Sequence, residues 1–429
     1  MKSQVIKGVK WTTIGTVLLA IVALLKVSIL ARYLDKEDFG LMALVTLVMG
    51  FMNLFNDMGL TSAILHKQEI SKREYASLYW FNGLVSCGMY VILLGVTPLV
   101  ASFYNEPLLN ELIPLLGLNL LFTGIGRMYK TIDQKSLLFK NVTLTEILSA
   151  LLSLGLAVVL AIKGYGVYAL VYSALLQYAL SNMILFIYGF RKYGLLLHYR
   201  FNETRPFLKI GMYQVGGQTI NYFNRDLDIL IIGKFFSAEV LGGYSLAKQL
   251  VMRPMQILNP ILTKVAAPTL AKFQNNMVAL KTNYLKLINA VSTINFLVYA
   301  LLLLFAPFAI KVLYGSGFEE IIYLVRVLCL YMFLRAISSP VGSLVTATGK
   351  THLEFYWNLV TLLITPVFIY VGSYFGVEGA AWGITLSLAV LFIPSWKLLI
   401  NRMTGASLED YLRAVSIPYL PVDRLRRYF

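Results

Sequence analysis

The chain has 429 residues, of which 58% are apolar and only 14% charged, and its formal net charge is +16. Soluble domains contain roughly 25% charged residues, so this composition excludes a soluble enzyme, a secreted disulfide scaffold and a disordered tail. The segment 296–310 is apolar on every face, whereas barrel strands alternate, so a membrane β-barrel is also excluded. The composition predicts an all-α, polytopic membrane protein.

About twelve segments are long and apolar enough to cross a hydrocarbon layer of ~30 Å as helices. The first is retained as a span because it is too long for a signal peptide and lacks a convincing cleavage site. In chain order we predict spans at 11–31, 40–64, 77–103, 109–128, 142–162, 165–189, 208–233, 239–263, 284–312, 321–345, 353–374 and 377–400.

The positive charges predict the orientation of these spans. Of the 37 Lys and Arg residues, 26 fall in the N-terminus, the alternate connections on its side and the C-terminal tail, and five fall in the opposite connections. Short cytoplasmic loops retain positive charge, so we expect both termini to be cytoplasmic and the protein to lie in the inner membrane. The membrane topology accounts for most of the net positive charge, and the cytoplasmic cations could also attract anionic membrane lipids. Nucleic acid is not an expected partner.

The two halves of the chain resemble one another. A displacement of 202 residues brings 31–40 (ARYLDKEDFG) onto 233–242 (GKFFSAEVLG), and one of 210 brings 165–172 (YGVYALVY) onto 375–382 (FGVEGAAW). Six helices per copy is an even number, so the copies are parallel repeats with a transport path between them. We predict an N-terminal six-helix lobe at 1–190, a cytoplasmic linker at 191–206, a C-terminal six-helix lobe at 207–402 and a basic cytoplasmic tail at 403–429.

Charged residues inside spans are the candidate functional residues, because a charge at mid-bilayer costs about 2.5–3.5 kcal/mol and needs a partner or a watery cavity. The basic candidates for binding an anionic headgroup are Lys26, Arg225, Lys248 and Arg253. Arg326 and Arg335 are weaker candidates because they lie on opposite sides of one helix. The acidic candidates, for ion coupling or for pairing between the lobes, are Asp57, Glu146, Asp226 and Asp228.

Two pairings are open for these charges. Arg225 and Asp228 are three residues apart and can pair on one helix face. Lys26 corresponds to Asp228 at the 202-residue displacement, so the pseudo-symmetry could bring these two charges together across the lobe interface. Each carboxylate could also neutralise a neighbouring cation.

The sequence contains no motif for catalysis or for a cofactor. It lacks GxxxxGK[ST], HExxH and GxSxG, and Cys87 and Cys329 both fall in apolar runs. We therefore expect no catalytic residue, no metal site and no cofactor.

Residues 29–44 (ILARYLDKEDFGLMAL), 54–64 (LFNDMGLTSAI), 224–233 (NRDLDILIIG) and 242–247 (GGYSLA) resemble bacterial polysaccharide flippases. These Wzx-type proteins belong to the multidrug/oligosaccharidyl-lipid/polysaccharide superfamily, and the likeness, over about residues 5–412, is to the branch of the colanic-acid exporter. In that branch a segment like 407–413 leads into a further helical pair, which this chain lacks, so its C-terminus could be truncated.

The resemblance implies two lobes around a central cavity that opens alternately to either side. The cargo would be an undecaprenyl-pyrophosphate-linked oligosaccharide for lipopolysaccharide or exopolysaccharide, with cavity cations on the pyrophosphate and the polysaccharide polymerase or export machinery as a further partner. The alternatives are a drug or small-metabolite exporter of the same superfamily and, less favoured, a membrane-embedded glycan polymerase or ligase. The six basic and four acidic residues inside the spans favour an anionic cargo.

Overall fold

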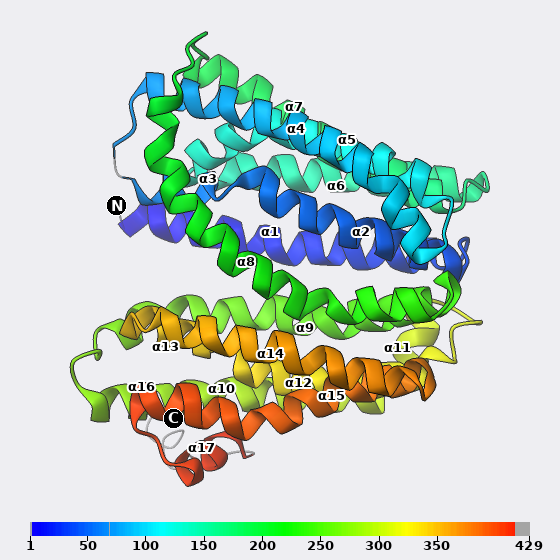
Figure 1. Cartoon of the computed structure of the whole chain (residues 1–429), viewed down its shortest axis with the longest axis vertical. Helices are drawn as coiled ribbons and strands as arrows, with labels where there is room; N and C mark the ends of the chain where they lie inside the picture. The colour runs from blue at the N-terminus through cyan, green and yellow to red at the C-terminus, as the bar shows by residue number, and fades with distance from the viewer. Residues whose placement is uncertain (1, 68, 417–429) are drawn as a thin grey trace. The chain divides into compact units, whose positions relative to one another are not determined.

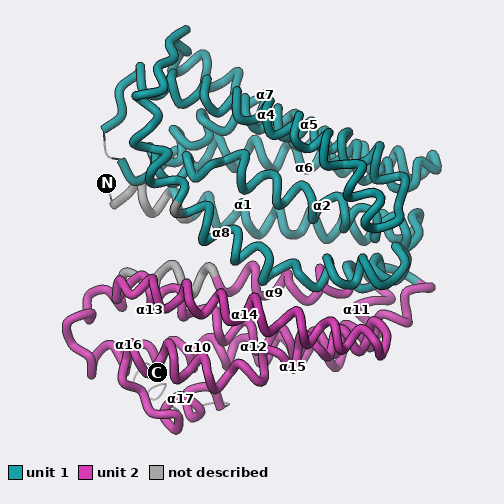
Figure 2. Tube along the Cα trace, in the orientation of Figure 1, with its two compact units in different colours: residues 1–245, 313–315 teal, residues 246–312, 316–429 magenta. Residues whose placement is uncertain are grey.

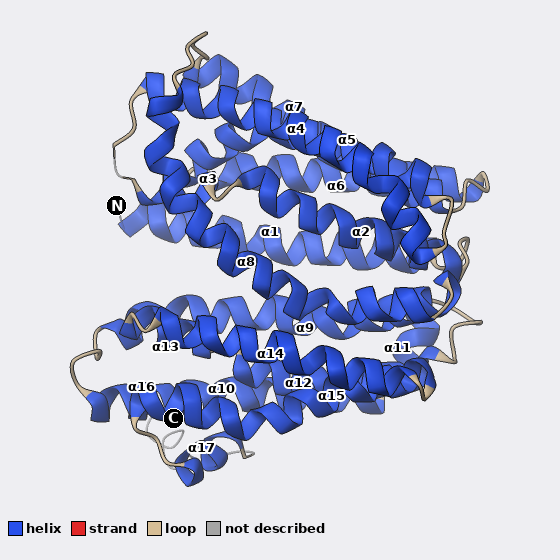
Figure 3. Cartoon of the chain, in the orientation of Figure 1, coloured by secondary structure: helices blue, strands red, loops and turns tan. Residues whose placement is uncertain are grey.

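The computed structural model describes residues 2–67 and 69–416, and within them every regular element is helical (Figures 1 and 3). The predicted tail lies largely outside the described residues, which end at 416. The first nine helices are α1 (Lys2–Leu30), α2 (Lys36–Asp57), α3 (Leu60–His66), α4 (Lys72–Tyr104), α5 (Leu109–Lys135), α6 (Phe139–Ile162), α7 (Val167–Tyr193), α8 (Phe201–Phe235) and α9 (Ala238–Ala271). The others are α10 (Met277–Leu304), α11 (Ala306–Leu313), α12 (Ile321–Ser338), α13 (Val341–Thr348), α14 (Thr351–Ser373), α15 (Gly376–Ser395), the π-helical η1 (Trp396–Asn401), α16 (Arg402–Thr404) and α17 (Leu408–Val415).

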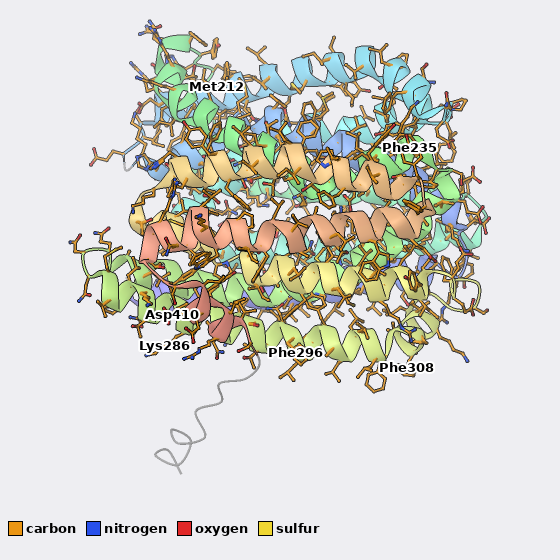
Figure 4. The ribbon with its side chains drawn as sticks, turned by 60° about the horizontal axis from the view of Figure 1, so that its bottom comes forward. Met212, Phe235, Lys286, Phe296, Phe308 and Asp410 are labelled. Carbon is orange, nitrogen blue, oxygen red and sulfur yellow. The ribbon has the colours of Figure 1, made fainter. Side chains whose placement is uncertain are left out.

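The helices confirm the predicted all-α membrane architecture. Within the described ranges, ten helical segments are long and apolar enough to cross a membrane. The two other predicted spans, 208–233 and 239–263, coincide with the long helices α8 and α9. Large apolar side chains such as Leu363 and Phe308 are 73% and 68% exposed, and Figure 4 shows Phe308 projecting outward from α11. Such surfaces suit a hydrocarbon solvent, and the chain is a multi-pass integral membrane protein.

The chain forms two compact units (Figure 2). Unit 1 comprises residues 1–245 and 313–315, and unit 2 comprises 246–312 and 316–429. Helix α8 packs against α2, α3 and α4 in unit 1, whereas the sequence repeat assigns α8 to the second lobe. The predicted lobe boundary at 191–206 therefore stays a prediction.

A break between α2 and α3 positions a carboxylate of unit 1. Met58 and Gly59 both adopt left-handed backbone conformations, with φ of 44° and 68°, which ends α2 at Asp57 and starts α3 in a new direction. The turn brings Thr61 back toward the end of α2, where its hydroxyl donates a hydrogen bond to Asp57 Oδ1 at 2.6 Å.

Buried amides and hydroxyls lock α5 against its neighbours. Asn56 of α2 donates to the carbonyl of Leu120 at 3.3 Å and accepts a 2.8 Å hydrogen bond from Ser86 of α4. Asn82 of α4 donates to the carbonyl of Gly124 at 2.9 Å. Small polar side chains are common between helices in membranes, because they allow close approach and hydrogen bond across the interface. These contacts fix the orientation of α5, which carries the cations described below.

Two glycines mark the closest helix crossing in unit 1, between the first turns of α2 and α9. A Cβ added to Gly40 would overlap the carbonyl oxygen of Ala238, and one added to Gly242 would overlap that of Lys36. The 202-residue displacement carries Lys36 onto Ala238 and Gly40 onto Gly242. Each glycine therefore lies against the residue that is equivalent to the contact of the other glycine. The contact within unit 1 thus joins positions that are equivalent in the sequence repeat.

In unit 2, the short helix α17 is docked on the rest of the unit. Asn289 and Ser292 of α10 donate hydrogen bonds of 3.1 and 2.7 Å to the last carbonyls of α17. Tyr411 is 1% exposed and stacks on Phe392 of α15, with ring centroids 5.3 Å apart. Asp410, labelled in Figure 4, forms a salt bridge with Lys281. Helix α17 is therefore an integral part of unit 2.

Candidate functional site

The predicted charged segment of α8 is folded around a local ion pair. Arg225 Nη2 lies 2.8 Å from Asp226 Oδ2, and its guanidinium also lies over the ring of Tyr222, 5.3 Å from the centroid. Neighbouring helix positions point about 100° apart, so sequence reasoning considered Asp228 and not Asp226 as the partner. The long arginine side chain bridges that angle. The side chain of Arg225 nevertheless stays 47% exposed.

Asp228 and Lys248 are both buried. Asp228 is 1% exposed and accepts a 2.6 Å hydrogen bond from the hydroxyl of Tyr244 on α9. Lys248 is 2% exposed, lies one turn further along α9 and belongs to unit 2. Arg253 is half-buried on the same helix.

Lys26 of α1 contacts α6 within unit 1. Its ammonium donates a 2.9 Å hydrogen bond to the hydroxyl of Ser153 on α6, and that hydroxyl in turn donates to the carbonyl of Ser173 on α7 at 2.6 Å. The contacts of Lys26 and of Asp228 are thus with different neighbours, and their predicted pairing stays a prediction.

The other two predicted carboxylates each form an ion pair with a cation that lines one cavity of unit 1. Asp57 Oδ1 lies 3.6 Å from Arg127 Nη1, and Glu146 Oε1 lies 2.6 Å from Lys130 Nζ. Arg127, Lys130 and Glu146 line a cavity of about 590 Å³. The complete lining is Leu19, Asn53, Thr61, Asn119, Thr123, Arg127, Lys130, Thr131, Gln134, Glu146, Gln177, Tyr178, Ser181, Asn182 and Leu185.

Sequence reasoning missed Arg127 and Lys130 because both lie at or just beyond the cytoplasmic end of the span predicted at 109–128, and both were counted among the cations of the following loop. Helix α5 instead continues to Lys135, and the two cations lie one turn apart on it. The extension is stabilised because each cation faces a carboxylate on another helix, which reduces the cost of keeping it inside the bundle.

Unit 2 contains an equivalent cavity of about 290 Å³. Ten residues that line the first cavity have repeat equivalents that line the second. The equivalent residue is found by adding 202 to the residue number on α2, 208 on α5 and α6, and 210 on α7. The pair Arg127 and Glu146 becomes Arg335 and Glu354, so both charged types are retained. This 208-residue correspondence is the signal in the sequence by which Arg127 and Glu354 could have been found.

Two solved structures have a fold similar to that of this chain. One is titled lipid II flippase MurJ in an inward closed conformation, with a TM-score of 0.77 and 14% identity over 95% of this chain and 90% of that one. Another is the inward-facing conformation of a multidrug resistance MATE family transporter of the MOP superfamily, with a TM-score of 0.73 and 17% identity over 92% and 98% of the two chains. The chain therefore shares its overall fold with these two proteins.

Residues 29–323 match the family described as "Polysaccharide biosynthesis protein", and the chain belongs to that family. It is similar to the lipopolysaccharide biosynthesis protein WzxC of Escherichia coli (strain K12), with 29% identity over 98% of this chain and 85% of the relative. It is also similar to the teichuronic acid biosynthesis protein TuaB of Bacillus subtilis (strain 168), with 26% identity over 97% and 86%. The resemblance found in the sequence is confirmed.

Proposed function

We propose that this protein flips lipid-linked oligosaccharide units across the inner membrane, by alternating access, for the synthesis of a surface polysaccharide. The observation that carries this proposal is the similarity, over nearly the whole chain, to proteins named for lipopolysaccharide and teichuronic acid biosynthesis. The fold it shares with a lipid II flippase supports the same activity. The protein acts as a transporter and not as an enzyme, and both of its termini lie in the cytoplasm.

The cargo is an oligosaccharide on undecaprenyl pyrophosphate, whose charged headgroup must cross a low-dielectric layer. Cations compensate that charge, while the lipid tail stays in the membrane. In this proposal Arg225, Lys248, Arg253 and Lys26 contact the pyrophosphate. Two features support it: Arg225 is held by Asp226 and Tyr222 while its side chain is 47% exposed, and Lys26 is held by a neutral hydroxyl that leaves its charge uncancelled.

The carboxylates Asp57, Glu146, Asp226 and Asp228 are the candidates for ion coupling. Asp57 and Glu146 sit beside the cavity of unit 1, where their pairing with Arg127 and Lys130 would respond to a proton or a small cation. A polysaccharide polymerase or export machinery would consume the flipped product.

The test is deletion of the protein followed by analysis of the lipid-linked oligosaccharides. An undecaprenyl-pyrophosphate-linked oligosaccharide should accumulate in the cytoplasmic leaflet, and wild-type protein should clear it. Arg225→Ala and Arg253→Ala should restore export poorly at normal protein abundance, whereas Lys163→Ala, an exposed cation between α6 and α7, should restore it fully. Accumulation of no such lipid would refute the proposal.

A further inference from the structure

The internal repeat allows the two cavities to be compared position by position. Arg127 and Glu146 have charged equivalents in Arg335 and Glu354, so these two positions belong to the shared scaffold, whereas their ion-pair partners Asp57 and Lys130 become Asn259 and Ser338. The uncharged polar side chains of the first cavity are not all retained in the second. At four equivalent positions a polar side chain in unit 1 is replaced by an apolar one in unit 2, namely Asn53 by Met255, Tyr178 by Leu388, Ser181 by Leu391 and Asn182 by Phe392. The fold of a lobe therefore does not require the polar groups of unit 1.

Several polar side chains that line the cavity of unit 1 have unused hydrogen-bonding capacity. Among the described residues, Gln134, Gln177 and Ser181 line the cavity without any side-chain hydrogen bond. The Nη1 atom of Arg127 is buried and has no hydrogen-bond partner there, since Asp57 at 3.6 Å is beyond hydrogen-bonding distance. Unsatisfied polar groups inside a membrane protein are costly and commonly mark a ligand or transport path. Donors and acceptors on α5 and α7 thus converge on one space.

The charged side chains at this cavity form two neutral ion pairs, and this neutrality indicates which kind of ligand the cavity binds. Arg127 faces Asp57 and Lys130 faces Glu146, leaving no excess positive charge for a pyrophosphate. Amides, hydroxyls and a phenol remain, and these groups match the hydroxyls of a sugar, which both donate and accept hydrogen bonds. The volume of about 590 Å³ is within the ~300–1,000 Å³ range of small-molecule sites. At ~30 Å³ per water it would hold roughly 20 waters, far more space than one cation needs.

We propose that the cavity of unit 1 is a binding subsite for uncharged sugar residues of the glycan, with Gln177, Ser181 and Asn53 among the groups that contact their hydroxyls. This inference rests on the proposed function. It separates two tasks of recognition: cations elsewhere in the chain bind the pyrophosphate, and the polar side chains of this cavity select the sugar.

The repeat also supplies the variant for the test. Ser181→Leu introduces the side chain that unit 2 carries at the equivalent position, Leu391. Gln177→Leu is a second variant, which keeps the test open if Ser181→Leu folds poorly. Met183→Leu is the matched control, because Met183 is on the same helix, is 40% exposed and does not line the cavity.

Binding is measured on the purified full-length protein with two probes. One is the undecaprenyl-pyrophosphate-linked oligosaccharide extracted from cells that lack the protein, and the other is undecaprenyl pyrophosphate without sugar. We expect Ser181→Leu and Gln177→Leu each to weaken binding of the glycan-bearing lipid about tenfold, the size of one or two lost hydrogen bonds. Binding of undecaprenyl pyrophosphate should be unchanged, and Met183→Leu should bind both probes like the wild type.

Three results would overturn the subsite. In the first, affinity for both probes falls together in both variants. In the second, neither variant changes the affinity for either probe. In the third, the variants remove a stabilisation of the protein by sodium while glycan binding is unchanged, which would make the cavity a cation site. Failure of the wild-type protein to bind the glycan-bearing lipid would instead refute the proposed function, so the two failures are distinguishable.

Discussion

The crossing of α2 and α9 predicts an unusual sensitivity to a single methyl group. Gly40→Ala would place a Cβ 2.6 Å from the carbonyl carbon of Ala238, and Gly242→Ala would place one 2.7 Å from that of Lys36. Carbon atoms in contact are normally ~3.5–4.0 Å apart, and the carbonyl oxygens would lie closer still to the added Cβ atoms, so the helices would have to separate by more than about 1 Å. The opposing atoms are backbone, and no side-chain rotation can relieve the overlap.

The expected loss of stability is about 2 kcal/mol for either substitution. Overpacking a tight contact costs roughly 1–3 kcal/mol, and the rigid backbone places this case at the upper end. Replacing glycine by alanine inside a helix returns about 1 kcal/mol of helix propensity. The double variant should lose less than the sum of the two single losses, because the first methyl already separates the helices and makes room for the second.

The assay is thermal unfolding of the purified protein in detergent, followed by tryptophan fluorescence. Gly88→Ala is the matched control, because Gly88 lies within α4 and an added Cβ would meet no atom within 4 Å. It should unfold at the wild-type temperature or slightly above, whereas Gly40→Ala and Gly242→Ala should unfold several degrees lower. A Gly40→Ala protein as stable as Gly88→Ala would refute the argument from close packing.

Three further outcomes are expected. Asp57→Ala should lower the stability by about 1–3 kcal/mol, because its partner Arg127 is only 13% exposed. Glu146→Ala should lower it by less than about 1 kcal/mol, because its partner Lys130 is 38% exposed. Equal shifts in the unfolding temperature of the two variants would contradict this reasoning. The hydrogen bond from Lys281 lowers the pKa of Asp410 to about 2, so this contact should stabilise the docking of α17 above pH ~4 and be lost as the pH falls toward 2. A spin label at Leu412 should report greater mobility of α17 as the pH falls. Asp410→Asn should abolish this pH dependence, because the asparagine does not titrate. Tyr411→Ala should cost about 3 kcal/mol by removing a buried ring that stacks on Phe392, and amide exchange should then increase in α17 but not in α1–α7; unchanged exchange in α17 would show that the ring does not hold it.

The spans could be predicted from the sequence because each depends on local composition. A run of about 20 apolar residues has few stable arrangements other than a membrane helix, and all twelve predicted segments coincide with helices. The ends were less predictable: α5 continues past residue 128 to Lys135 because its cations meet carboxylates from distant helices. Such compensation depends on residues that the local sequence does not contain.

The candidate site, too, was predictable from the sequence only in part. Asp57, Glu146 and the 224–228 segment could be selected because charges in apolar helices are costly wherever they point. Their partners could not, since Arg127 is 70 residues from Asp57 in the sequence and Arg225 pairs with a neighbour that helical geometry places on another face. The polar cavity of unit 1 has no local signature at all, because its lining comes from six helices.

The sequence by itself determined that this is a helical membrane protein with an internal repeat and a family resemblance, because hydrophobicity, charge distribution and repeated motifs are properties of short segments. Only the tertiary structure decided that Gly40 and Gly242 face each other across one helix crossing, and that the Arg127 and Arg335 positions line equivalent cavities of different polarity. The physical reason is that packing and charge compensation join residues far apart in the chain. Side chains become neighbours only when the helices that carry them are assembled.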